Sequence, residues 1–370
     1  MQPAPAIPHA SPTVSVNRVR LVDLPGFPVD AGVRGQQAYH LLSTLAVTRY
    51  AQAQAAALEL PAQLRDAPPD SPEVRRELPR YVDACLSSPD PAVQAAAESI
   101  ARRLGRNLGY ILLTLHRGDA VNRAARADWT DAEWAHWATV RQVWLGGGVL
   151  SGDLGARTVA AARALLAEAG LGETLQVALS PYPRDMALVG AARYLPPDVS
   201  TALCCDFGHT SVKCGVVQLT DGNITALTPL ATRHTPWNWQ NRPDAAVGIE
   251  PAFVRDYIAA TLAEAATEAD IRLEEVMLSI AAYVRGGELI GNGVYTPLRA
   301  LGPDARPLLA EAVAVRAGAR PNISLIHDGT AAAALHAGSA HSAVLSVGTA
   351  IGIGFPPEEA GLRQIKIARY

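Results

Sequence analysis

Apolar residues recur at helical spacing through much of the first half of the chain, which predicts amphipathic helices. The first helical run spans Gly35 to Leu60, and a polar, proline-rich break follows at Asp66–Pro72. Strand-like apolar runs begin only after residue 139. The predicted order there is strand with a glycine-rich turn, helix, strand and helix, over 140–150, 156–171, 174–180 and 185–195.

The pattern changes after Pro196–Ser200, where three strand-like runs follow one another with short turns between them. Beyond residue 250, helices and apolar strands alternate to the end of the chain. Such alternation is typical of the α/β class. The three strands are expected over 201–207, 211–219 and 224–230, and the later elements over 253–270, 276–284, 305–318, 322–328, 329–338 and 342–355.

The charge balance excludes several classes of partner. The chain has 370 residues, with 32 Lys and Arg against 35 Asp and Glu, so its net charge is −3. This balance predicts no basic surface, and we expect neither nucleic acid nor an anionic membrane as partner. The uncharged stretch from Gly329 to Pro357 contains four further glycines, which does not suit a membrane-spanning helix.

The chain contains four cysteines, Cys85, Cys204, Cys205 and Cys214, at no spacing that suits zinc. Because Cys204 and Cys205 are adjacent, we do not expect a disulfide framework. The sequence therefore predicts reduced thiols and a cytoplasmic protein.

The strongest chemical signal is the segment DFGHTSVKCG, from Asp206 to Gly215. Asp206 lies at the end of a predicted apolar strand. A short turn follows it, and a second predicted strand begins at Ser211. Such a hairpin can cradle a terminal phosphate at Gly208 and Thr210, with Asp206 holding Mg²⁺ through water. Lys213 either adds positive charge there or only caps the strand. An ordinary hairpin with an Asp at its turn is the alternative for the whole segment.

Two glycine-rich turns follow other predicted strands. In VGTAIGIG, Gly348 and Thr349 can offer N–H and hydroxyl donors to phosphate oxygens. The spacing is not G-x-G-x-x-G and no helix pattern follows, which excludes a dinucleotide-binding fingerprint. The turn formed by Gly146, Gly147 and Gly148 can pack against a flat nucleotide base. A strand bend or an ordinary turn is the alternative for both segments.

Asp328 stands between a strand end and an alanine-rich helix, in the segment IHDGT. As a catalytic base it would accept the proton of a substrate hydroxyl that attacks a γ-phosphate. As a plain N-cap it would need no further role.

Together these segments resemble the ROK family of sugar kinases, within the superfamily of sugar kinases, acetate kinases and actin-like ATPases. DFGHTSVKCGVV is similar to that family's first phosphate hairpin, IHDGTAAAAL to its catalytic-Asp segment, and AVLSVGTAIGIGF to its second phosphate motif. VWLGGGVL and DMALVGAARYL resemble its nucleotide-side turn and closing helix. These two normally end the chain but here precede the Asp206 hairpin. The resemblance therefore implies a circular permutant joined through Pro196–Ser200, with a fused, incomplete second copy as the alternative.

Several residues depart from the family pattern. His209 replaces the second glycine of the hairpin, and His327 and Thr330 replace the two asparagines beside the catalytic Asp. The G-E-x-G-H sugar segment and the cysteine-rich zinc motif of the family are absent from the sequence. The candidate substrate residues are His327, with Glu288 and Asn292 in the loop that normally faces substrate. A solvated loop is the alternative for the last two.

The resemblance implies a two-lobed, actin-like ATPase (ribonuclease H-like) α/β fold that closes over a nucleotide cleft. We expect a large lobe of residues 1–195 and 339–370 and a small lobe of residues 201–338. The implied activity is phosphoryl transfer from ATP, with Mg²⁺, to a hydroxyl of a small sugar-like substrate, with Asp328 as general base. A homodimer is an open option. The alternatives are a catalytically weak sugar or nucleotide sensor of the same fold, and an ATPase that acts on a non-sugar partner.

Overall fold

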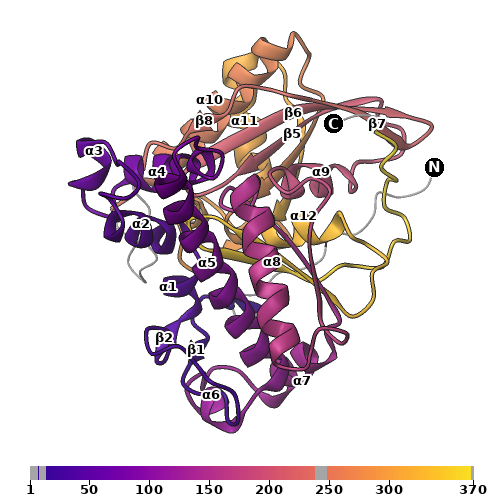
Figure 1. The fold of residues 1–370 in the computed structure, drawn as a ribbon. Coiled ribbons are helices and arrows are strands. Elements are labelled where there is room, and N and C mark those ends of the chain that lie inside the picture. Colours follow the sequence, from indigo (N-terminus) through magenta and orange to yellow (C-terminus); the bar gives the residue numbers. More distant parts are fainter. Residues whose placement is uncertain (1–6, 8–13, 238–247, 368–370) are drawn as a thin grey trace. The chain divides into compact units, whose positions relative to one another are not determined.

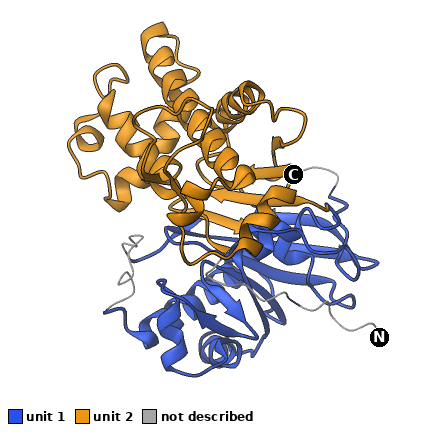
Figure 2. Cartoon of the chain, turned by 90° about the horizontal axis from the view of Figure 1, so that it is seen from below, with its two compact units in different colours: residues 1–12, 185–339, 354–370 blue, residues 13–184, 340–353 orange. Residues whose placement is uncertain are grey.

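The structure is a computed structural model of the chain, in which residues 7, 14–237 and 248–367 are described. The chain divides into two compact units, coloured separately in Figure 2. Unit 1 comprises residues 1–12, 185–339 and 354–370, and unit 2 comprises residues 13–184 and 340–353. Each unit contains its own main sheet with helices, so the α/β class is confirmed.

The sheet of unit 1 is mixed. Its strands are β5 (Thr201–Phe207), β6 (Ser211–Thr220), β7 (Asn223–Pro229), β8 (Arg233–His234), β9 (Glu275–Ile280) and β12 (Asn322–His327). Their spatial order is β12-β9-β5-β6-β7, and β8 also pairs with β6. β5, β6 and β7 form an antiparallel meander, whereas β9 runs parallel to both β5 and β12. The carboxyl ends of β5, β9 and β12 therefore meet at one edge of the sheet.

In the described part of unit 1, four helices, a 3₁₀ helix and a small hairpin accompany this sheet. They are α9 (Met186–Ala192), β10 (Tyr283–Arg285), β11 (Glu288–Ile290), α10 (Pro251–Ala269), η2 (Thr296–Ala300), α11 (Ala305–Ala317) and α12 (Asp328–Ala334). α10 packs on α11, and α9 packs on α12. The α9–α12 contact is close because α9 presents Gly190, where a Cβ would lie 1.8 Å from the carbonyl oxygen of Ala331.

Two segments that were expected in the large lobe group with unit 1. These are residues 185–195 and 354–370. The buried Arg193 side chain makes hydrogen bonds to two other segments of unit 1. Its Nε donates to the Arg363 carbonyl at 2.8 Å, and its Nη1 donates to the Ala334 carbonyl at 2.7 Å. These hydrogen bonds tie the residues after α9 and the C-terminal segment to α12.

Unit 2 is largely helical around a second sheet. Its strands are β1 (Arg20–Leu21), β2 (Gln36–Gln37), β3 (Gln142–Gly146), β4 (Gln176–Leu179), β13 (Ser342–Val347) and β14 (Ile351–Gly354). Its helices are α1 (Ala38–Leu41), α2 (Thr44–Ala53), α3 (Ala62–Arg65), α4 (Pro72–Cys85), α5 (Pro91–Arg117), α6 (Ala120–Ala124), α7 (Asp131–Thr139) and α8 (Asp153–Glu168). The main sheet has the order β14-β13-β3-β4, with β13, β3 and β4 parallel. α5 and α8 lie side by side (Figure 1).

Some predicted elements are divided by local hydrogen bonding. The helical run from Gly35 to Leu60 contains two helices, because the Ser43 hydroxyl accepts the Ala46 N–H at 3.4 Å and caps a new helix. The strand expected over 276–284 ends at Ile280 and resumes at Tyr283 in a separate hairpin. Within the described ranges, no helix combines the length and hydrophobicity that a membrane crossing would need.

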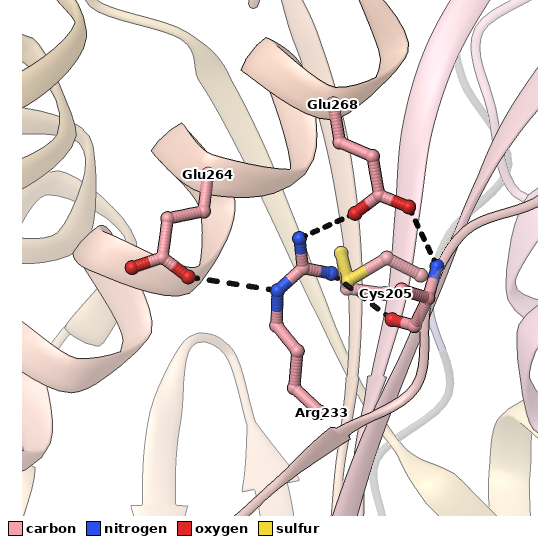
Figure 3. Close-up of a disulfide and its surroundings, with 6 residues drawn as sticks. Cys205, Arg233, Glu264 and Glu268 are labelled. Carbon is pink, nitrogen blue, oxygen red and sulfur yellow. Dashed lines mark hydrogen bonds and ion pairs between the residues drawn. A yellow bond between two sulfur atoms is a disulfide. The ribbon is translucent and has the colours of Figure 1, made fainter.

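The expectation of four reduced thiols is wrong for two of them. Cys205 on β5 and Cys214 on β6 form a disulfide, which Figure 3 shows, and their Cα atoms are 4.1 Å apart. The two residues are direct partners in the antiparallel register, which brings their side chains together. The adjacency of Cys204 and Cys205 does not prevent this bond, because the register of the hairpin pairs Cys205 with Cys214. Cys85 and Cys204 are free and buried.

Candidate active site

Asp206 lies near the carboxyl end of β5, among polar side chains from neighbouring strands. The Ser279 hydroxyl on β9 donates to its Oδ1 at 3.0 Å. Lys213 is its direct partner in the β5–β6 register, and the Lys213 Nζ lies 3.9 Å from an Asp185 carboxylate oxygen. Burial raises the pKa of Asp206 to about 6, while the charge of Lys213 opposes that shift.

Asp328 follows β12 directly and begins α12. The Gly329 N–H donates to its Oδ1 at 2.7 Å, which leaves Oδ2 without a hydrogen bond to another described residue. Its side chain keeps 30% of its surface exposed. Burial raises the pKa of Asp328 to about 6, against the effect of the backbone hydrogen bonds. The negative charge of Asp328 also raises the pKa of Asp206, so the two carboxyl groups interact.

His327 is held by its neighbours rather than presented to solvent. Its ring stacks on Tyr283 at 4.7 Å between centroids, and its Nδ1 accepts the Thr330 N–H at 3.2 Å. The hydrogen of the neutral ring is therefore on Nε2, which lies 3.1 Å from Oδ1 of Asp328. Burial lowers the pKa of His327 to about 3, which keeps the ring neutral. This geometry favours a cap of α12 over a substrate ligand.

The turn after Asp206 contains Gly208 and Thr210 with defined hydrogen bonds. The Gly208 N–H donates to the Ser211 carbonyl at 3.0 Å, and the Thr210 carbonyl accepts the Thr235 N–H at 3.2 Å. His209 is not among the described residues with positive φ. A side chain at position 209 therefore costs the turn no backbone strain.

Glu288 and Asn292, the other expected substrate residues, lie apart from this group of contacts. Glu288 begins β11 opposite Arg285, and Asn292 follows the hairpin. Both residues are exposed. Neither makes a hydrogen bond or ion pair with Asp328 in the described part of the chain.

Unit 2 brings together the two glycine-rich turns. Gly147 has a φ of +94°, and a Cβ there would lie 2.4 Å from the Val347 carbonyl oxygen. The Val149 N–H donates to that same carbonyl at 3.1 Å. Because β3 and β13 are parallel neighbours, the turn from Gly146 to Gly148 lies directly beside Gly348 and Thr349. The Thr44 N–H of α2 also donates to the Gly348 carbonyl at 2.8 Å.

The donor set around Asp206 suits a magnesium ion better than a metal that needs many protein ligands. Among the residues with described positions, no group of three His, Cys, Asp or Glu side chains is placed to hold a metal ion. Mg²⁺ keeps several waters and is usually bound by one or two carboxylates together with substrate phosphates. Asp206 fits this pattern, since only its Oδ1 accepts a hydrogen bond from a described residue.

Sequence reasoning missed Ser279, Tyr295 and Thr235, which contact the Asp206 hairpin from other elements. Ser279 carried a weak signal as the one polar residue in the apolar run VMLSIAAYV. Tyr295 and Thr235 carried none, because both lie in loops without a motif. Their contacts depend on where distant segments of the chain meet.

We compared the chain with protein families, curated proteins and solved structures. No protein-family model and no curated protein matches the chain. Among solved structures, the chain is similar to an inorganic polyphosphate/ATP-glucomannokinase from Arthrobacter sp. strain KM, with 19% identity and a TM-score of 0.31. The match covers 44% of this chain and 60% of that kinase, which is less than two thirds of its length. A similarity of this extent assigns neither a family nor a function to the chain.

Proposed function

We propose that this protein transfers the γ-phosphoryl group of ATP to a hydroxyl of a small, sugar-like substrate. The observation that carries the proposal is the pair of interacting carboxyl groups on Asp206 and Asp328, at the carboxyl ends of two strands of one sheet. The pKa of Asp328 is raised to about 6, which suits a group that must accept a proton near neutral pH. The turn from Gly208 to Ser211 follows Asp206 directly.

The two carboxyl groups have different surroundings and would take different roles. Oδ2 of Asp328 would accept the substrate hydroxyl proton as the hydroxyl oxygen attacks the γ-phosphorus and ADP leaves. Asp206, anchored by Ser279, would hold Mg²⁺ through water. When bound, Mg²⁺ neutralises charge on the phosphates. For Gly348 and Thr349, which lie beside the Gly147 turn of unit 2, phosphate binding stays a prediction from the sequence.

The strand orders of the two units support the actin-like fold and its permutation. In unit 1, the consecutive strands β5 and β6 precede β9 and β12 in the sequence, and the spatial order is β6-β5-β9-β12. Unit 2 has the corresponding order β14-β13-β3-β4, but there the consecutive strands β13 and β14 come last in the sequence. The two units would thus share one strand arrangement, but in unit 2 the strands β3 and β4 come before the hairpin β13–β14 in the sequence. A circular permutation predicts such an exchange of order.

A contact near the start of the chain also supports the permutation. The side chain of Asn17 binds both backbone groups of Ile351: its Nδ2 donates to the carbonyl and its Oδ1 accepts the N–H, each at 2.8 Å. Residue 17 therefore lies beside β14, where an unpermuted chain would continue.

Substitution of Asp328 by Asn tests the proposed activity. We expect D328N to lower sugar-dependent ADP formation by about 100-fold or more, the usual contribution of a general base. Its affinity for Mg·ATP should stay within a few-fold of wild type, because the base does not bind the nucleotide. ADP release would be measured with a panel of monosaccharides, and nucleotide affinity by calorimetry.

Asp304 provides a matched control for this substitution. It is a carboxylate of unit 1 that pairs with Arg306 at 2.7 Å, so D304N should leave turnover close to wild type. Near-normal turnover of D328N would exclude Asp328 as the base. Nucleotide or sugar binding by the wild type without any ADP release would instead favour the sensor, and ADP release without sugar dependence would favour an ATPase with a non-sugar partner.

A further inference from the structure

Three consecutive carbonyl groups of the turn after Asp206 are bound by side chains or backbone from other elements. The Tyr295 hydroxyl donates to the Gly208 carbonyl at 2.6 Å. The Thr235 hydroxyl donates to the His209 carbonyl at 2.8 Å, and the Thr235 N–H to the Thr210 carbonyl at 3.2 Å. Two residues distant in the sequence thus hold three consecutive carbonyl groups of the turn.

Because the peptide unit is planar, the direction of each carbonyl group also fixes the direction of the N–H group that follows it. In a trans peptide the C=O and the following N–H point in opposite directions. A carbonyl held by Tyr295 or Thr235 therefore directs the next N–H away from that residue. The three N–H groups concerned belong to His209, Thr210 and Ser211. Successive N–H groups that share one side of a turn form a concave site for an anion.

Both anchoring residues are themselves fixed. Tyr295 is fully buried, with edge-to-face contacts to Phe207 at 6.1 Å and to Trp237 at 5.2 Å between ring centroids. Its burial raises the pKa of Tyr295 well above the usual value, so the hydroxyl remains a donor. A turn that is held by fixed residues needs no reorganisation of its N–H groups when a ligand binds.

Thr235 follows β8, which is attached to α10. Figure 3 shows Arg233 of β8 between Glu264 and Glu268, at 3.6 Å and 2.6 Å. The second Glu268 oxygen accepts the Ala231 N–H at 2.7 Å. Thr235 is 8% exposed and presents two donors from this anchored strand to the turn.

We infer that Tyr295 and Thr235 are positioning residues that hold the turn so that the N–H groups of His209, Thr210 and Ser211 bind the phosphates of the nucleotide. The inference rests on the proposed function and adds to it the residues that set affinity for the phosphate part of the ligand. Neither residue touches the phosphate itself.

The test uses single-atom changes in the full-length protein. Y295F removes one hydroxyl, and T235V removes the other while it keeps the shape of the side chain. We expect each to weaken Mg·ATP binding about 3- to 10-fold, the range for one neutral hydrogen bond. Affinity for adenosine, which has no phosphate, should not change. With Mg·ATP bound, amide hydrogen exchange at residues 209–211 should be faster in both variants than in wild type.

Two variants control for general damage. T235S keeps the hydroxyl and should restore wild-type affinity. Y194F removes a hydroxyl of unit 1 that has no hydrogen-bond partner in the described part of the chain, and it should be neutral. Equal losses for adenosine and Mg·ATP, or unchanged Mg·ATP affinity in both Y295F and T235V, would overturn this inference alone. A wild-type protein that binds no Mg·ATP would overturn the proposed function and this inference with it.

Discussion

The hydroxyl of Ser279 donates a 3.0 Å hydrogen bond to Oδ1 of Asp206 across the β5–β9 pair. Ser279 is fully buried. Its hydrogen bond stabilises the charged form of Asp206 and lowers the pKa of that carboxyl group, whereas burial of Asp206 raises the pKa. S279A is therefore expected to raise the pKa of Asp206 above its value of about 6. The pH dependence of Mg·ATP binding measures this shift. As pH falls, protonation of Asp206 should weaken binding, and in S279A this loss should begin at a higher pH than in wild type.

Ser324 on β12 gives a matched control for the loss of a hydroxyl from the same sheet. S324A should keep the wild-type pH profile. An identical profile for S279A and wild type would show that the hydrogen bond does not control the charge of Asp206.

Asp206 and Asp328 should lower the stability of the fold at neutral pH. Their pKa values in the folded protein, about 6, exceed the unfolded value of 3.8. The folded state therefore binds these protons more tightly, and its stability falls as pH rises from about 4 through 6. D206N and D328N remove the charge, so both should unfold at a higher temperature than wild type at pH 7.5.

The difference between these variants and wild type should shrink as pH falls through 6 and then below 3.8, because the carboxyl groups become neutral first in the folded state and then in the unfolded state as well. Thermal unfolding at several pH values would measure it. A constant difference across that range would contradict the raised pKa values. Activity should show the opposite trend and fall below pH 6, since a protonated Asp328 cannot accept a proton.

Two adjacent glycines should respond very differently to alanine. At Gly147, φ is +94° and a Cβ would lie 2.4 Å from Val347, whereas at Gly148 nothing lies within 4 Å and φ is not positive. G147A should lower the free energy of unfolding by about 2 kcal/mol or more through strain and collision, and G148A should leave it nearly unchanged. Chemical denaturation of both variants measures their free energies of unfolding. Equal losses in G147A and G148A would contradict this account of the turn.

The disulfide gives a direct count of reactive thiols. Without reductant, the denatured protein should show two thiols, from Cys85 and Cys204, and after reduction four. The double substitution of Cys205 and Cys214 by serine should lower stability by roughly 2–3 kcal/mol in the chain-entropy account, because the cross-link closes a short loop. Four thiols before reduction would show that the two cysteines are not bonded.

Local pattern alone predicted most of the elements that form the sheet of unit 1. β5, β6 and β7 lie close to the expected runs, because apolar spacing and turn residues act between near neighbours. Asp206 and Asp328 were predicted as site residues for the same reason, since each follows an apolar strand. Where local hydrogen bonds compete, as at Ser43, the pattern predicted one element in place of two.

Contacts between distant segments were decided by the tertiary structure. The sequence by itself determined the α/β class, the strand ends that carry acids and the order of the motifs, because these depend on residues close in the chain. Only the folded chain decided that Cys214 faces Cys205, that Ser279 binds Asp206 and that Tyr295 holds Gly208. Register and packing set these pairs, and no short-range pattern encodes which segments will become neighbours.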